Sequence, residues 1–327
     1  MKFAVCGSIA TDHLMTYAGR FADSLVPEEL HQISVSFLVD DLQVRRGGVA
    51  ANVSFGMAKL GHQPILVGAV GDDFASYRSW LQRHGVNCDY LWVSEVRHTA
   101  RFIVTTDTAM AQIASFYAGA MSEARNIELG PILDAEGSLS LVVISPDDPD
   151  AMLRHSTECR TRGLPFAADP SQQLAFMDGP SIRRLVDGAT YLFTNEYEAA
   201  MTEQKTGWDS AEILRRVGTR VITRGKDGCS VISANAETID VPVAGEVTPV
   251  DPTGVGDGFR AGFLAGLAWD LGHERCAQLG STVASYVLST VGTQEYEVDR
   301  DSFLARMKLS YGTAAADEVE PHLGRDY

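Results

Sequence analysis

Short apolar runs alternate with longer segments of helical periodicity along most of this 327-residue chain. Runs rich in Val, Ile and Phe predict β-strands at residues 3–8, 64–67, 141–145, 166–169, 191–194 and 220–224. Apolar residues spaced three and four apart predict helices at residues 50–60, 74–84, 151–162, 211–217 and 255–271. Because strands that alternate with helices are typical of parallel sheets, the pattern predicts a mostly parallel sheet covered by helices.

Two segments interrupt this rhythm. Residues 32–44 and 101–117 alternate between apolar and polar positions, as two-sided or antiparallel strands do. We therefore expect a small β-sheet lid, inserted discontinuously as residues 13–45 and 98–120. The α/β core is expected to comprise residues 1–12, 46–97 and 121–327.

Charge and cysteine content exclude several classes of function. The chain has 27 Lys and Arg against 43 Asp and Glu, a formal net charge of -16, which disfavours nucleic acid and anionic membrane surfaces as partners. Five cysteines without paired spacing predict buried thiols in a reducing compartment. Asp12 and His13 interrupt the only stretch that resembles a signal peptide, so a cytoplasmic location is expected.

The strongest local motif is Asp251-Pro-Thr-Gly-Val-Gly-Asp257, between a strand expected at residues 247–250 and the helix that follows. A glycine-rich turn entering a helix exposes backbone amides, here of Gly254, Val255 and Gly256, that can bind a phosphoryl group as an anion hole. Asp257 would lie beside it, ionised by the helix dipole, and could accept the proton of an attacking hydroxyl. Alternatively, the glycines only form a tight turn and Asp257 only complements the dipole.

A second glycine turn, at Gly47 and Gly48, enters another expected helix, and Asn52 follows one turn later. Paired glycines allow a ligand close to the backbone, and an Asn side chain can bind sugar hydroxyls as donor and acceptor. Ser8 and Asp12 follow the first strand, where ligands approach open α/β sheets. As alternatives, the glycines form an ordinary turn, and Ser8 and Asp12 cap turns or helices.

Two motifs follow later strands. Asn195 and Glu198 have the spacing of a helix capping box, but they could also orient the water shell of a magnesium ion. The segment from Thr223 through Gly225 to Gly228 resembles a nucleotide-binding loop, and it could equally be a hairpin turn.

The order of these motifs resembles that of the ribokinase-like (PfkB) carbohydrate kinases. The resemblance covers nearly the whole chain and implies a three-layer α/β/α core with a β-sheet lid, ATP as phosphate donor and Mg²⁺ as cofactor. Several further segments, such as His98-Thr-Ala-Arg-Phe102 and Ala168-Asp-Pro-Ser-Gln172-Gln173, are similar to the adenosine kinases of actinobacteria. The expected reaction is therefore phosphorylation of the 5′-hydroxyl of adenosine, with Asp257 as the base.

The same resemblance implies ligands for individual residues. Ribose would be held by Ser8, Asp12, Gly48 and Asn52, and the purine by Phe102, Phe116, Gln172 and Gln173. ATP would be held by Asn195, Thr223, Gly225 and Gly228, and Mg²⁺, through water, by Glu198. A monovalent cation such as K⁺ would be held by Asp251, Thr253 and Gly292, and two subunits would pair through the lid. A sugar kinase like ribokinase or fructokinase, and a non-catalytic nucleoside-binding regulator, remain the alternatives.

Overall fold

The core is an eight-stranded sheet in the order β14-β13-β12-β11-β10-β9-β1-β4. This computed structural model describes residues 1–25, 31–32, 34–245 and 247–324. From β4 to β12 the strands run parallel, and the β12-β13-β14 edge is antiparallel. The strands are β1 (Phe3–Cys6), β4 (Ile65–Val67), β9 (Leu141–Ile144), β10 (Phe166–Ala168), β11 (Tyr191–Asn195), β12 (Thr219–Thr223), β13 (Cys229–Ser233) and β14 (Ile239–Val241). All six core strands predicted from the apolar runs are confirmed.

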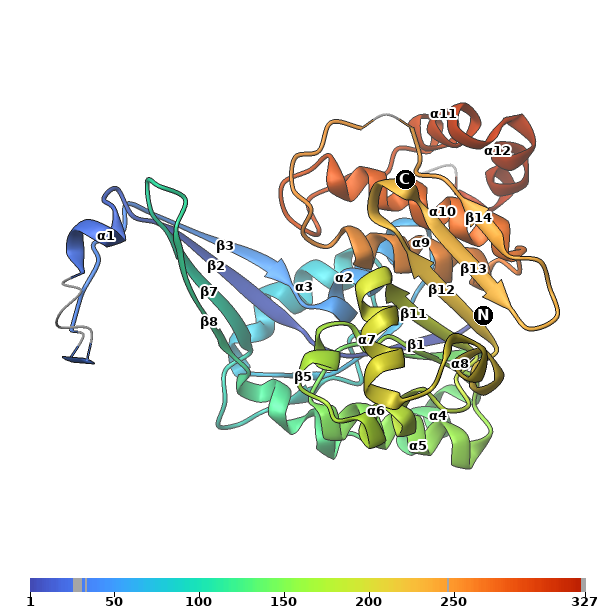
Figure 1. Cartoon of the computed structure of the whole chain (residues 1–327), viewed down its shortest axis with the longest axis horizontal. Helices are drawn as coiled ribbons and strands as arrows, with labels where there is room; N and C mark the ends of the chain where they lie inside the picture. The colour runs from blue at the N-terminus through green and yellow to red at the C-terminus, as the bar shows by residue number, and fades with distance from the viewer. Residues whose placement is uncertain (26–30, 33, 246, 325–327) are drawn as a thin grey trace.

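Helices cover both faces of this sheet, which confirms the three-layer α/β/α core (Figure 1). In β1, Phe3 and Val5 pack on one face while Ala4 and Cys6 pack on the other, as the two-residue period of a strand requires. The first face is covered by α2 (Val49–Lys59), α3 (Ala75–Arg83), α9 (Val255–Ala268), α10 (His273–Leu288), α11 (Arg300–Tyr311) and α12 (Thr313–Val319). The second is covered by α4 (Gly130–Glu136), α5 (Pro149–Arg162), α6 (Gly179–Val186) and α8 (Ser210–Arg216), with α7 (Glu196–Thr206) beside α6.

A separate four-stranded sheet forms the lid and projects from the core as a long ribbon (Figure 1). Its strands are β2 (Ala10–Thr16), β3 (Asp41–Gly47), β7 (Ala100–Thr106) and β8 (Gln112–Tyr117), in the order β3-β2-β7-β8. A short helix, α1 (Phe21–Ser24), lies near its tip, and β5 (Ala69–Val70) pairs with β6 (Trp92–Val93) at its base.

The lid differs in detail from the prediction. The strand expected at residues 32–44 begins only at Asp41, and the segment 101–117 is two strands joined by a turn. Asp12, expected at the end of the core segment, lies inside the lid strand β2. Residues 26–30 and 33 of the expected lid, and 246 and 325–327 of the expected core, lie outside the described residues.

Two helices of the first face fix the position of the motif that ends in Asp257. Helices α9 and α10 pack so closely that a Cβ atom at Gly262 would lie 2.5 Å from the carbonyl oxygen of Leu279. The prediction of a strand at residues 247–250 is wrong. This segment is irregular, and the Val250 amide donates a hydrogen bond to the Leu288 carbonyl.

The thiol prediction is confirmed in part, because all five cysteines are buried as free thiols. Among the helices of the described ranges, none combines the length and the apolar character needed to span a membrane.

Candidate active site

Asp257 and Asn52, 205 residues apart in the sequence, meet at the N-terminal ends of α9 and α2. The Nδ2 atom of Asn52 donates a hydrogen bond of 2.8 Å to Oδ2 of Asp257. Asp257 is the third residue of α9, directly after the turn at Gly254, whose φ of 75° is in the left-handed region that glycine tolerates. The two glycine motifs of the sequence therefore belong to one site.

The orientation of the Asn52 amide is set by two residues that the motifs did not indicate. Its Oδ1 accepts hydrogen bonds of 2.9 Å from Thr293 Oγ1 and of 2.9 Å from Gln294 Nε2. Because hydroxyl and amide groups donate to this oxygen, the Nδ2 group must face Asp257 and donate to it. This arrangement favours an ionised, accepting carboxylate at Asp257. Thr293 and Gln294 lie in an irregular segment with no motif, so only the fold reveals them.

Burial and hydrogen bonding act in opposite directions on Asp257. Burial raises the pKa of its carboxyl group, whereas the charge of Arg260 and the hydrogen bond from Asn52 oppose that shift. Desolvation is the largest influence on this carboxyl group in the structure, and the ionisation attributed to the helix dipole stays a prediction. Ionisation therefore depends on the neighbouring polar groups, and Arg260 is the cation among them.

The anion hole expected at Gly254, Val255 and Gly256 lies at the start of α9. The amide of Val255 also makes a long hydrogen bond, 3.4 Å, to the carbonyl of Pro252. The first amides of an α-helix have no partner inside the helix, so this end of α9 can bind an anion.

One cross-strand row of the lid contains three of the predicted ligand-binding residues. Asp12 of β2 pairs in register with Phe102 of β7, which pairs with Phe116 of β8. Side chains at paired positions lie on the same face of a sheet, so the carboxylate and the two rings share one face. Phe102 is 37% and Phe116 53% exposed, so both rings are accessible to a ligand. Burial raises the pKa of Asp12 to about 6, against the charge of Arg45.

Ser8 and Gly48 form the junction between β1 and α2. The Oγ of Ser8 accepts a hydrogen bond of 3.1 Å from the amide of Val49, the first residue of α2. Ser8 thus acts as a helix cap, as one of its two interpretations proposed. Gly48 has a φ of 94°, and a Cβ atom there would lie 2.6 Å from the backbone of Ser8, Ile9 and Ala10. Only glycine fits this close approach.

The loop after β10 carries Gln172 and Gln173 in a 3-10 helix, η4 (Ser171–Ala175). The Nε2 of Gln173 donates a hydrogen bond of 2.8 Å to the backbone carbonyl of Asp147, in the loop after β9. A carbonyl oxygen can only accept, so this bond assigns the nitrogen of the Gln173 amide to Asp147. The acceptor Oε1 and the second N–H of Nε2 then remain for a ligand.

With this geometry in place, comparison with known proteins gives the family. Residues 8–300 match the sequence profile of the pfkB family of carbohydrate kinases. The chain belongs to this family. A nucleoside kinase of Methanothermobacter thermautotrophicus is 30% identical over 289 residues, which cover 87% of this chain and 92% of the relative. One from Methanocaldococcus jannaschii is 28% identical over 283 residues, with coverage of 86% and 91%.

Solved structures agree with the family. The nucleoside kinase of Burkholderia thailandensis, solved in complex with inosine, is 32% identical and superposes with a TM-score of 0.81, covering 95% of this chain and 98% of that chain. The fold is therefore ribokinase-like. These relatives are named nucleoside kinases, a broader term than the actinobacterial adenosine kinase suggested by the sequence segments.

The residues predicted to bind ATP gather at and just after the carboxyl ends of β11 and β12. Asn195 and Thr223 are paired in register there. Asn195 and Glu198 form the capping box of α7: the Asn195 side chain accepts from the Glu198 amide, and the Glu198 side chain accepts from the Asn195 amide, both at 2.8 Å. Gly225 and Gly228, with φ of 55° and 83°, form the turn between β12 and β13. The structural interpretation of each motif is confirmed, and their nucleotide-binding role stays a prediction.

The residues expected at metal ions are positioned differently from each other. Glu198 is close enough to Asp169 and Arg260 to influence the pKa of each, and one of its oxygens accepts from the Asn195 amide. Its other oxygen could bind Mg²⁺ through water. Asp251 instead accepts from the amides of Thr253 (2.9 Å) and Gly292 (3.1 Å). Each of its oxygens accepts one hydrogen bond and keeps a second lone pair, so Asp251 could still contribute to a monovalent cation site.

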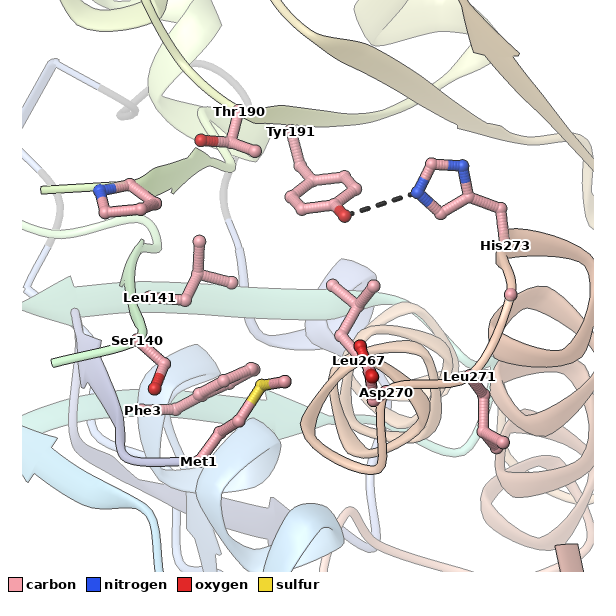
Figure 2. Close-up of a pocket in the computed structure, with 12 residues that line it drawn as sticks. Met1, Phe3, Ser140, Leu141, Thr190, Tyr191, Leu267, Asp270, Leu271 and His273 are labelled. Carbon is pink, nitrogen blue, oxygen red and sulfur yellow. Dashed lines mark hydrogen bonds between the residues drawn. The ribbon is translucent and has the colours of Figure 1, made fainter.

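A pocket at the opposite edge of the sheet lies at the amino ends of the strands, away from these residues. Phe3, Leu141 and Tyr191, at the starts of β1, β9 and β11, line it together with Leu267 and His273 (Figure 2). The Tyr191 hydroxyl and His273 Nε2 are 3.2 Å apart. Since it contains none of the residues predicted to bind ligands, this pocket is not the active site of the kinase.

Proposed function

We propose that this kinase transfers the γ-phosphoryl group of ATP to the 5′-hydroxyl of adenosine, giving AMP and ADP for purine salvage in the cytoplasm. The contact between Asn52 and Asp257 at the N-terminus of α9 carries the proposal. It joins a proton acceptor to a helix end suited to anions, and the relatives named nucleoside kinases support the substrate class.

In the proposed reaction, the oxygen of the 5′-hydroxyl forms a bond to the γ-phosphorus, and Asp257 accepts the proton of that hydroxyl. The bond from that phosphorus to the β,γ-bridging oxygen breaks, and ADP leaves. Phosphoryl transfer passes through a loose transition state in most analyses, so positioning and charge stabilisation dominate. The amides at Gly254, Val255 and Gly256 would stabilise charge on the transferring group.

Two sets of residues would hold the substrates around Asp257. We assign Ser8, Asp12, Gly48 and Asn52 to ribose, and Asn195, Thr223, Gly225 and Gly228 to ATP. When bound, Mg²⁺ would neutralise phosphate charge near Glu198, and K⁺ is the candidate for the loop of Asp251, Thr253 and Gly292. The purine would lie against Phe102 and Phe116, because aromatic rings stack on a base.

The Gln173 amide supports adenosine over inosine. Its Nε2 donates one N–H to the Asp147 carbonyl, which fixes the orientation of the amide and leaves Oε1 as its hydrogen-bond acceptor. Adenosine carries an amino group, which donates, at the purine position where inosine carries an oxygen, which accepts. We propose that Oε1 faces this position, where it would accept from the amino group of adenosine and would find no donor on the oxygen of inosine. The inosine complex of the Burkholderia thailandensis enzyme makes this choice a direct test between two purines.

Wild-type protein should therefore phosphorylate adenosine with a higher kcat/KM than inosine, ribose or fructose. Replacing Gln173 with Met keeps its length but removes the acceptor, and should reduce the adenosine-to-inosine ratio roughly tenfold, the effect of about 1.4 kcal/mol. The measurement is ADP release with each acceptor. The matched control is Gln204→Met, the same change at an exposed position of α7 outside the residues assigned to the purine.

A clear preference for ribose or fructose would refute the nucleoside assignment and favour a sugar kinase. Adenosine binding without turnover would instead indicate a non-catalytic nucleoside-binding protein. A Gln173→Met variant with an unchanged purine ratio would remove the argument for adenosine from the amide orientation.

We also propose a homodimer that forms through the lid. The face opposite the Asp12 row exposes the apolar side chains of Leu42, Val44 and Ile113, which occupy alternate positions of β3 and β8. Exposed apolar patches of this kind mark interaction surfaces. Pairing two lids would remove them from water.

Replacing Val44 with Glu should convert the dimer to a monomer, because a buried unpaired carboxylate is costly. Light scattering coupled to size-exclusion chromatography would measure the mass. Replacing the exposed Leu309 of α11, which lies away from the lid, with Glu serves as the control and should leave the mass unchanged. A wild-type monomer at high concentration would exclude the lid dimer.

A further inference from the structure

A buried ion pair joins α9, the helix that carries Asp257, to the start of the loop at residues 169–175. This loop carries Gln172 and Gln173 and is called the purine loop. Asp169 directly follows β10 and precedes η4, while Arg260 lies one turn after Asp257 on α9. The guanidinium contacts both carboxylate oxygens, with Nε 2.6 Å from Oδ2 and Nη2 2.6 Å from Oδ1. Asp169 is 0% and Arg260 7% exposed, so the pair is separated from solvent.

Stability does not explain this pair. Removing two charges from water costs several kcal/mol per ion, and well-packed apolar replacements of buried pairs are often neutral or stabilising. Burial raises the pKa of Asp169 to about 6 even with Arg260 beside it, which shows the strength of desolvation here. A buried ion pair is therefore weak evidence of a stabilising contact, and its place beside Asp257 is the more informative feature.

Arg260 is the cation acting on Asp257. The charged and titratable groups that interact with that carboxylate come from several elements: Arg260 lies on the same helix, Asp169 after β10 and Tyr296 in the segment after α10. Glu198 of α7 acts on Asp169 and Arg260. Of these, only Arg260 is positive. A Cβ atom at Gly256 would lie 2.9 Å from its Nη1, so Arg260 also packs against the anion-hole turn.

We propose that Asp169 and Arg260 are a positioning pair, which keeps Asp257 ionised in its desolvated site and fixes the purine loop relative to it. Arg260 supplies the charge, and Asp169 fixes both the guanidinium and the first residue of the loop that carries Gln172 and Gln173. The inference deepens the proposed function and rests on it. In this arrangement the position of the bound purine and the ionisation of Asp257 both depend on the contact between Asp169 and Arg260.

Opposite changes at the two positions test the proposal. Arg260→Gln removes the positive charge. The apparent pKa at which kcat/KM falls on the acid side of the pH profile, its acid limb, should therefore rise by about one unit. At low pH kcat/KM should be about tenfold below wild type, and the difference should diminish as pH increases. Asp169→Asn removes a negative neighbour of Asp257 and leaves Arg260 charged. Its acid limb should stay or move to lower pH, while KM for the nucleoside rises severalfold because the loop loses its anchor.

Two further variants separate positioning from folding. Arg260→Lys retains the charge without the bidentate geometry, so it should keep the acid limb near the wild-type value and raise KM. The control is Arg220→Gln in β12. Arg220 is buried, and its Nη2 lies 3.2 Å from Oε1 of the partly exposed Glu203, so this variant also breaks an arginine ion pair. It should lower the midpoint of urea unfolding without moving the acid limb.

An acid limb that is the same in wild type, Arg260→Gln and Asp169→Asn would overturn the proposal, as would a shift in the Arg220→Gln control. If Arg260→Gln does not fold, an unchanged KM for the nucleoside in both Arg260→Lys and Asp169→Asn would overturn the proposal instead. If the wild type phosphorylates a sugar instead, the proposed function fails. The acid limb would then be measured with that sugar, and the effect of Arg260 on Asp257 would be judged separately.

Discussion

Replacement of Asp257 by Asn is expected to lower kcat by at least 10² to 10⁴-fold, the usual contribution of a positioned general base. The Asn side chain has the same shape and can still accept the hydrogen bond from Asn52, so adenosine affinity should change little. It cannot take the hydroxyl proton, and the negative charge beside Arg260 is lost as well. ADP release would give kcat, and calorimetric titration would give the affinity.

A matched control exists at the start of another helix. Asp299 caps α11, where its Oδ1 accepts from the Ser302 amide at 2.9 Å, and an Asn there preserves the cap. Asp299→Asn should leave both kcat and affinity unchanged. Turnover close to wild type in Asp257→Asn would exclude Asp257 as the base, whereas loss of adenosine binding in that variant would point to a structural function instead.

The core of this kinase could be predicted from the sequence because its signals are local. Several of the parallel strands are apolar runs, such as Leu141–Ile144, and five of the cover helices, α2, α3, α5, α8 and α9, were predicted from the spacing of their apolar residues. The lid was harder. The turn in residues 107–111 and the start of β2 at Ala10 depend on pairing between distant segments, which a single segment does not encode.

Some residues of the site could likewise be predicted from local motifs, and others could not. Asp257, Asn52 and the glycines occur in motifs that the backbone needs, since positive φ angles and close approaches restrict the residue type. Thr293 and Gln294 act only by orienting Asn52, and Arg260 looks like one polar residue inside an apolar helix. Its partner Asp169 lies 91 residues away, so no spacing in the sequence could have indicated the pair.

The same glycine argument predicts a large effect of Gly48→Ala on both stability and substrate binding. The φ of 94° would strain any other residue by about 1–3 kcal/mol. The added methyl would also meet backbone atoms of Ser8, Ile9 and Ala10 at 2.6 Å, and overpacking of this kind typically costs about 1–3 kcal/mol. Backbone atoms cannot rotate away as a side chain does, so the β1–β2 connection must move.

Because that connection carries Ser8 and leads into Asp12, the movement should raise KM for the nucleoside at least tenfold in the protein that still folds. Urea unfolding would measure the stability loss, and initial rates the KM. Gly137→Ala isolates the strain, since Gly137 has a φ of 78° with nothing within 4 Å of an added Cβ. That control should lose about 1 kcal/mol and keep its KM. Equal losses in the two variants would mean that the backbone contact at Gly48 is not the reason for glycine there.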